Sequence, residues 1–89
     1  MRQEARLINR GEQFEYLEND RRYAGQCVWE WEGARRSYPI TLLANSIGRK
    51  GIGLFLPMTR RRKNKIADRV KQLLEHQIQG AQVRIWWEP

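Results

Sequence analysis

The strongest chemical feature of the sequence is a run in which five basic residues fill six positions: Arg60, Arg61, Arg62, Lys63 and Lys65. An amphipathic helix is predicted to begin here. Because a helix start carries partial positive charge, each cation there lowers the stability of the helix by about 0.3–1 kcal/mol at low salt. The free N–H groups of a helix start bind phosphate oxygens, and arginine adds bidentate hydrogen bonds. The run therefore predicts an anion-binding site. The alternatives are a solvated charged loop and a docking surface for an acidic protein.

A second basic element precedes this run. Gly48-Arg49-Lys50-Gly51 belongs to a glycine-rich segment, residues 45–51, that is predicted to be a hairpin connection. Its glycines let the backbone come close to a ligand, and Arg49 and Lys50 supply charge. If this connection and the helix start meet at one end of the sheet, they form a single basic patch.

Trp86 differs from the other tryptophans because it lies beside Arg84 and Glu88 on the polar face of a predicted strand. An aromatic residue in this position is expected to stack on an unpaired base, to anchor a homodimer together with Arg84, or to fill a second small core. The remaining tryptophans fall on apolar faces and are expected in the core: Trp29, Trp31 and Trp87.

Residue patterns typical of enzymes are weak, so a catalytic function is not expected. His76 and Cys27 are the only residues of their types, which is too few for a zinc site of three or four nitrogen and sulfur ligands. No phosphate-binding loop or dinucleotide fingerprint occurs, so we predict no cofactor and no metal. The acidic residues near the start are interpreted as a solvated face: Glu12, Glu15, Glu18 and Asp20. A small basic ribonuclease is the enzyme alternative, since such a site has no characteristic spacing.

Length and charge limit the remaining possibilities. The 89 residues are expected to form one domain. Seventeen basic and ten acidic residues give a net charge of +7, with −2 in residues 1–34 and +9 in residues 35–89. The longest apolar runs are far shorter than the ~18 residues that a membrane span requires. A single cysteine and the lack of an apolar leader predict a cytoplasmic protein.

Hydrophobic periodicity predicts the elements that position these residues. Alternation or short apolar runs indicate strands at 14–17, 26–32, 38–44, 52–56 and 82–88. An apolar stripe with helical spacing indicates one helix, capped by Thr59 or Asn64 and followed by Gly80: Ile66, Val70, Leu73, Leu74 and Ile78. Residues 1–12 fit either one helical turn or a flexible segment, because Gly11 interrupts the pattern.

These elements predict an α+β fold of order β-β-β-β-α-β, with an uncertain first element. The sheet is expected to be mixed and mainly antiparallel, with four to five strands and the helix packed on one face. A right-handed crossover through the helix is predicted to make the strands at 52–56 and 82–88 parallel. The second face is expected to carry Phe55, Trp86 and Val28.

The predicted function is binding of nucleic acid, RNA or DNA, through backbone phosphates and with little sequence specificity. The binding residues are Arg60, Arg61, Arg62, Lys63 and Lys65, assisted by Arg49 and Lys50. Arg69 and Lys71 would extend the track. The alternative is a small protein-interaction subunit or inhibitor that docks on an acidic partner, since an acidic protein resembles a polyanion electrostatically. A homodimer formed through an exposed edge strand is a further possibility.

Overall fold

Six strands in one sheet and a single α-helix make up the described part of the chain. The computed structural model describes residues 2–30, 33, 36–51 and 55–89, with the backbone alone for residues 55 and 56. The predicted α+β class is confirmed. In chain order the elements are β1 (Gln3–Ile8), the 3-10 helix η1 (Asn9–Gly11), β2 (Gln13–Glu18), β3 (Arg21–Trp29), β4 (Tyr38–Lys50), β5 (Phe55–Leu56), α1 (Arg60–Gln77) and β6 (Ala81–Trp86).

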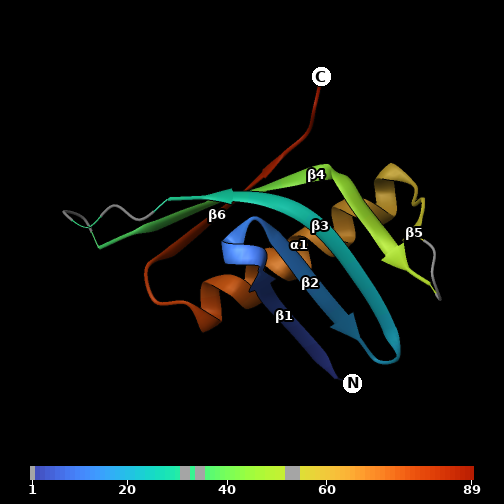
Figure 1. The fold of residues 1–89 in the computed structure, drawn as a ribbon, viewed down its shortest axis with the longest axis horizontal. Helices are drawn as coiled ribbons and strands as arrows, with labels where there is room; N and C mark the ends of the chain where they lie inside the picture. The colour runs from blue at the N-terminus through green and yellow to red at the C-terminus, as the bar shows by residue number, and fades with distance from the viewer. Residues whose placement is uncertain (1, 31–32, 34–35, 52–54) are drawn as a thin grey trace.

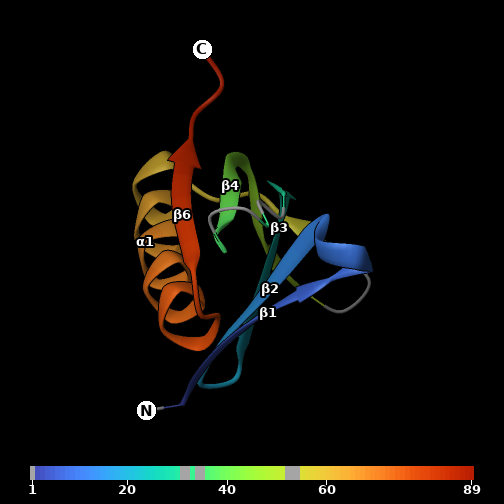
Figure 2. The same ribbon diagram turned by 90° about the vertical axis from the view of Figure 1, so that its left-hand side faces the viewer.

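The sheet is mixed, as predicted. Strands β1 to β5 follow one another in antiparallel order, and β6 pairs in parallel with the first half of β4. The first element is therefore a strand, because Gln3 to Ile8 pair with β2, and the helical turn proposed for residues 1–12 is wrong. Two residues, Asn19 and Asp20, connect β2 to β3, and Asn19 takes a positive φ of 55°. Figures 1 and 2 show the two chain ends at opposite ends of the molecule.

The predicted partner of the last strand is wrong. β6 lies parallel to β4, with Tyr38 opposite Ala81 and Leu43 opposite Trp86. β5 instead runs antiparallel to the far end of β4, where Arg49 pairs with Leu56. β3 pairs with both halves of β4 along one edge, so β6 and β5 share the other edge, β6 along the first half and β5 at the far end. Residues 52–54 of the predicted strand lie outside the described residues.

The hairpin connection predicted for residues 45–51 is also wrong, since β4 continues to Lys50. A large bulge replaces it: Gln26 pairs with Leu43 and Ala24 with Gly48, so residues 44–47 face Gly25 alone. The Ser46 hydroxyl fills the gap in the ladder, because its Oγ accepts from Gln26 N at 2.7 Å and donates to Leu43 O at 2.5 Å.

The bulge changes which β4 residues face the helix. Ile40 and Leu42 are buried before it, and Ala44 and Ile47 are buried at its two ends. The inward positions therefore change from even to odd numbers. Gly25 gives the bend room, because a Cβ at this position would lie 2.5 Å from Phe14 Cζ.

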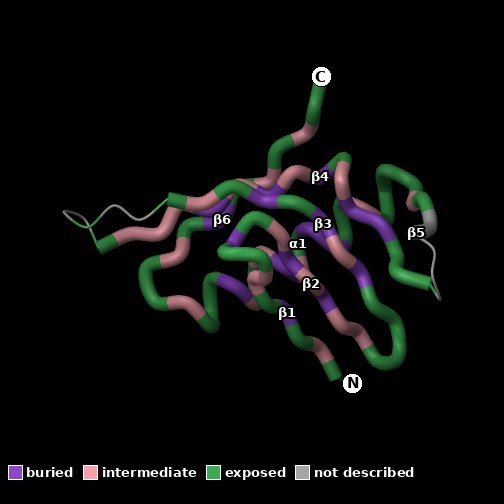
Figure 3. Tube along the Cα trace, viewed as in Figure 1, coloured by how far each residue is buried: buried purple, intermediate pink, exposed green. Residues whose placement is uncertain are grey.

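Helix α1 packs on the face of the sheet formed by these inward residues (Figure 2). Thr59 is its N-cap, as predicted, since its Oγ1 accepts from Arg62 N at 3.3 Å. Asn64 lies within the helix, so the alternative cap is wrong. The helix ends at Gln77, and Gly80 turns the chain into β6 with φ of 86°. Figure 3 shows the buried segments on the strands and on α1, and the buried helix residues are Ile66, Ala67, Val70 and Leu74.

Ser46→Ala tests the role of the bulge. The substitution leaves Gln26 N–H and Leu43 C=O without this partner, and we expect a loss of about 1–3 kcal/mol in the free energy of unfolding. Thr41→Val is the control, because it removes from the same strand a hydroxyl that makes no hydrogen bond within the described residues. Urea denaturation measures both. Equal losses would contradict a specific role for Ser46.

Candidate anion-binding site

The predicted basic run occupies the first turn and a half of α1, and no acidic residue lies in the first turn. Its side chains leave the helix in different directions. The Arg60 guanidinium carbon lies 4.6 Å from the centroid of the Trp87 ring, a cation–π contact with the C-terminal segment. Lys63 Nζ donates to Asn45 O at 2.8 Å, at the bulge of β4. Arg60 and Lys63 thus bind the protein's own groups on the β6 side of the helix.

The other side of the helix carries a stripe of cations. A rotation of about 100° per residue places four residues on one flank: Arg61, Arg62, Lys65 and Arg69. Arg62 Nη2 lies 3.5 Å from Tyr23 Oη, at the limit of a hydrogen bond, while Arg61 and Lys65 are exposed. This flank faces the connection between β2 and β3. Lys71 lies on the opposite flank, so it does not extend the stripe.

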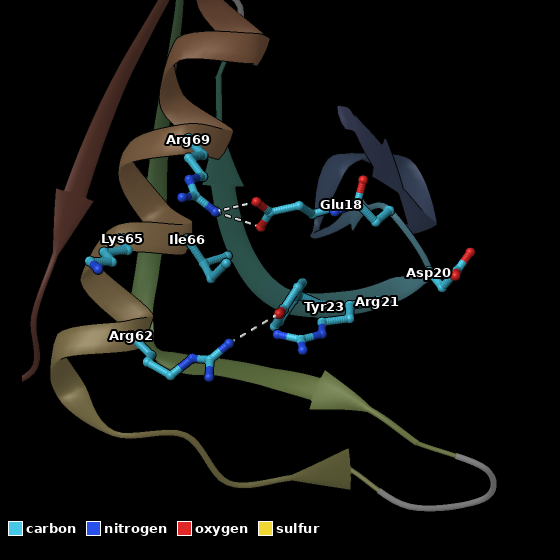
Figure 4. A pocket seen from close by; sticks show the side chains of 9 residues that line it. Glu18, Asp20, Arg21, Tyr23, Arg62, Lys65, Ile66 and Arg69 are labelled. Atoms are coloured by element: carbon cyan, nitrogen blue, oxygen red, sulfur yellow. Dashed lines mark hydrogen bonds and ion pairs between the residues drawn. The ribbon is translucent and has the colours of Figure 1, made fainter. Parts of the chain in front are cut away.

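A cleft of about 600 Å³ separates the stripe from the β2–β3 connection. Figure 4 shows Arg62 reaching toward Tyr23 from the helix, with Arg21 reaching in from the start of β3. Cations from two elements that are far apart in sequence therefore line one cleft. Its lining consists of Glu18, Asn19, Asp20, Arg21, Tyr23, Arg62, Lys65, Ile66 and Arg69.

Arg49, from the glycine-rich segment, lies beside this cleft. It lies opposite Tyr23 in the β3–β4 register, and Arg49, Tyr23 and Arg62 line a smaller hollow of about 220 Å³. This hollow adjoins the cleft through Tyr23 and Arg62, which line both.

Lys50 does not share this environment. Its Nζ lies 3.6 Å from Glu15 Oε1, on the opposite face of the sheet. Burial raises the pKa of Glu15, but the hydrogen bond from Arg6 and the charges of Lys50 and Arg6 outweigh it and hold that pKa below its usual range. The bulge explains the separation of Lys50 from Arg49, because it turns odd-numbered residues of β4 toward the helix.

Two carboxylates lie at the far end of the cleft. Arg69 Nη1 pairs with both oxygens of Glu18, at 2.5 and 2.6 Å, and Asp20 lines the same cleft. The Tyr16 hydroxyl lies close by, buried and with no hydrogen-bond partner among the described residues. Burial and the charge of Glu18 raise the pKa of Tyr16, and Arg69 opposes them. Arg69 was expected to extend the track, but its charge is balanced by Glu18.

Five cations around the cleft and the adjoining hollow have no carboxylate partner within the described residues: Arg21, Arg49, Arg61, Arg62 and Lys65. We call them the cationic cluster. Arg21 was missed by the sequence analysis because it is the first residue of β3, directly after the two-residue turn at Asn19 and Asp20. No local signal indicates that this turn lies against a helix more than 35 positions later.

Trp86 and Arg84 lie away from the cluster. They point to the face of the sheet opposite α1, where Trp86 is 48% exposed, so the core interpretation of Trp86 is wrong. Trp29 and Trp87 are half-buried and pack against the core, in agreement with the prediction. Trp31 lies outside the described residues.

Comparison with models of protein families, with curated proteins and with solved structures finds no match for this chain. No helix in the described ranges is long and apolar enough to cross a membrane. The same residues contain no group of three or more His, Cys, Asp or Glu side chains placed to hold a metal ion.

Arg61→Glu tests whether the helix start carries an electrostatic cost. The change removes a cation and adds an anion near free N–H groups, so we expect the free energy of unfolding to rise by about 0.5–2 kcal/mol at low salt. High salt should reduce the gain. Gln72→Glu is the control, since it adds an anion to the same flank far from the helix start. Thermal denaturation at two salt concentrations compares the variants, and an equal gain in both would contradict the helix-start explanation.

Proposed function

We propose that the protein binds nucleic acid through backbone phosphates, which contact the cationic cluster. One observation carries this proposal: α1, β3 and β4 bring five cations to one side of the molecule without carboxylate partners. Four of the five are arginines, whose guanidinium groups match phosphate oxygens in a bidentate way.

The chemistry of the cleft favours backbone contact with little sequence specificity. Guanidinium groups, one ammonium group and the Tyr23 hydroxyl offer donors to phosphate oxygens. The first turn of α1 adds partial positive charge, which favours an anion close to Arg61 and Arg62. An anion bound here would also offset the electrostatic cost of placing cations at a helix start.

The double variant Arg49→Ser/Arg62→Ser tests this proposal. Binding of labelled single- and double-stranded oligonucleotides of about 20 nucleotides, DNA and RNA, is measured by fluorescence anisotropy as salt is raised. Five phosphate contacts predict a slope of log affinity against log salt of about −3.5 to −4.5, and the double variant should lose about 1.4–1.8 of it.

Arg2→Ser/Arg6→Ser is the matched control, because it removes the same number of charges from β1. Arg2 and Arg6 there pair with Glu4 and Glu15 at 3.0 and 3.1 Å. This control should leave the slope nearly unchanged. An equal effect of both double variants, each with a native circular dichroism spectrum, would show that net charge alone matters and would overturn the site.

A second candidate function is docking on another protein, which Glu18 and Asp20 favour because they give one end of the cleft the opposite sign. In this case the Glu18–Arg69 pair would lie in a contact of mixed charge. For a nucleic acid, the same carboxylates are repulsive.

Glu18→Gln separates the two candidates. It frees Arg69 and removes a negative charge, so nucleic-acid binding should strengthen and the salt slope should steepen by about 0.7–0.9, one added contact. The same anisotropy titration measures this change, with Glu12→Gln, an exposed acid away from the cleft, as control. Weaker oligonucleotide binding by Glu18→Gln would contradict the nucleic-acid proposal.

A further inference from the structure

The sheet face opposite α1 is uncovered in its β3, β4 and β6 part. Strand register arranges its outward residues in rows across the three strands. Gln26, Leu43 and Trp86 form one row, and Val28, Thr41 and Arg84 form the next. Val28 is 55% exposed and Trp86 48%, and they are the exposed large hydrophobic residues of the described chain. Exposed apolar side chains grouped on one face are typical of an interaction surface.

The same face has a raised and a hollowed part. Trp86 stands at the β6 side, next to the open edge of the sheet. At the β3 side there is a hollow of about 520 Å³, whose lining includes the outward residues Gln26, Val28 and Leu43. Arg10 and Glu12, from the segment between β1 and β2, close its outer side. A flat aromatic side chain and an adjacent, partly apolar hollow are complementary in shape.

Strand geometry relates these two parts to one another. β6 and β3 flank β4, so they lie two strand spacings apart, about 9–10 Å. If a second copy packs face to face about a twofold axis parallel to β4, its β6 lies over β3 of the first. Because Trp86 shares a row with Gln26, each Trp86 then lies over the hollow of the other copy. The twofold axis makes this contact twice.

The charges on the face fit a second copy better than an acidic partner. Around these two rows the cations Arg10 and Arg84 are equal in number to the acids Glu12 and Glu30, so this part of the face is neutral by count in a chain of net charge +7. Lys50 lies farther along the same face and pairs with Glu15. The twofold arrangement places Arg84 of one copy over the row of Val28 in the other. Glu30 is two residues after Val28 and therefore lies close to this Arg84. A nucleic acid or acidic protein would gain no net attraction on this face.

We propose that this face is a self-association surface, on which a second copy of the chain inserts Trp86 into the hollow beside Val28 and Leu43. Three strands about 14 Å wide and 20 Å long offer about 300 Å², less than the ~800 Å² per partner of a standard interface. The dimer is therefore weak, and it leaves the cationic cluster of each copy accessible on the opposite face. The proposal is independent of what the cluster binds.

Sedimentation of the purified chain from about 10 µM to 1 mM, at about 0.3 M salt to screen the net charge, tests the proposal. We expect the mean mass to rise with concentration from 10.7 kDa toward twice that value. Trp86→Ala removes the inserted ring, and Val28→Lys places a charge at the hollow. Each should raise the dissociation constant at least tenfold. Gln72→Ala, on the exposed side of α1, should not change it.

A charge exchange tests the twofold arrangement. Arg84→Glu and Glu30→Lys should each weaken the dimer, and the double variant should recover most of the loss. A chain that stays monomeric at 1 mM, or a dimer unaffected by Trp86→Ala, would overturn the proposal. Weaker oligonucleotide binding by Trp86→Ala in a monomeric protein would also overturn it and would assign the face to base stacking. Arg49→Ser/Arg62→Ser should leave the dimer intact, so this result does not depend on the proposed function.

Discussion

The bulge in β4 is the constraint on which the rest of the structure depends. The Ser46 hydroxyl accepts from β3 and donates within β4, so the ladder bends without leaving these backbone groups unpaired. The bend lets Ile40 and Leu42 before it, and Ile47 at its end, face the same helix. It also exposes Asn45, whose backbone oxygen accepts from Lys63 and whose Oδ1 accepts from Glu88 N. One irregularity thus fixes the sheet, the helix start and the C-terminal segment together.

Cations at the start of α1 divide into two groups with different roles. Arg60 and Lys63 contact Trp87 and Asn45, so they stabilise the docking of the helix on the rest of the chain. Arg62 and Lys65 line the cleft, Arg61 lies on the same flank of the helix, and none of the three has a carboxylate partner within the described ranges. The electrostatic cost of the second group is not offset within the described part of the chain, and this is the physical basis for assigning it an anionic ligand.

The sheet separates two surfaces of different chemistry. The face covered by α1 opens into a cleft whose cations suit a polyanion, and its acidic end limits how far such a ligand extends. The opposite face exposes apolar side chains at Val28 and Trp86, and the charged residues around them are equal in number, two cations and two acids. Because α1 and the sheet lie between the two surfaces, a ligand can occupy one without contacting the other. The proposed dimer would present two cationic clusters and strengthen attachment to a long polyanion.

The sequence by itself determined features that depend on neighbouring residues. The helix and its Thr59 cap, the outward side of Val28 and Trp86, and the α+β class follow from periodicity and local hydrogen bonding. Tertiary structure decided which strand pairs with β6, why Arg49 joins the cluster while Lys50 pairs with Glu15, and why Arg21 and Glu18 line the cleft. These outcomes depend on the register between distant segments. Because residues 44–47 face Gly25 alone, the β4 residues after them point to the reversed faces of the sheet, and alternation within a single strand cannot predict that change.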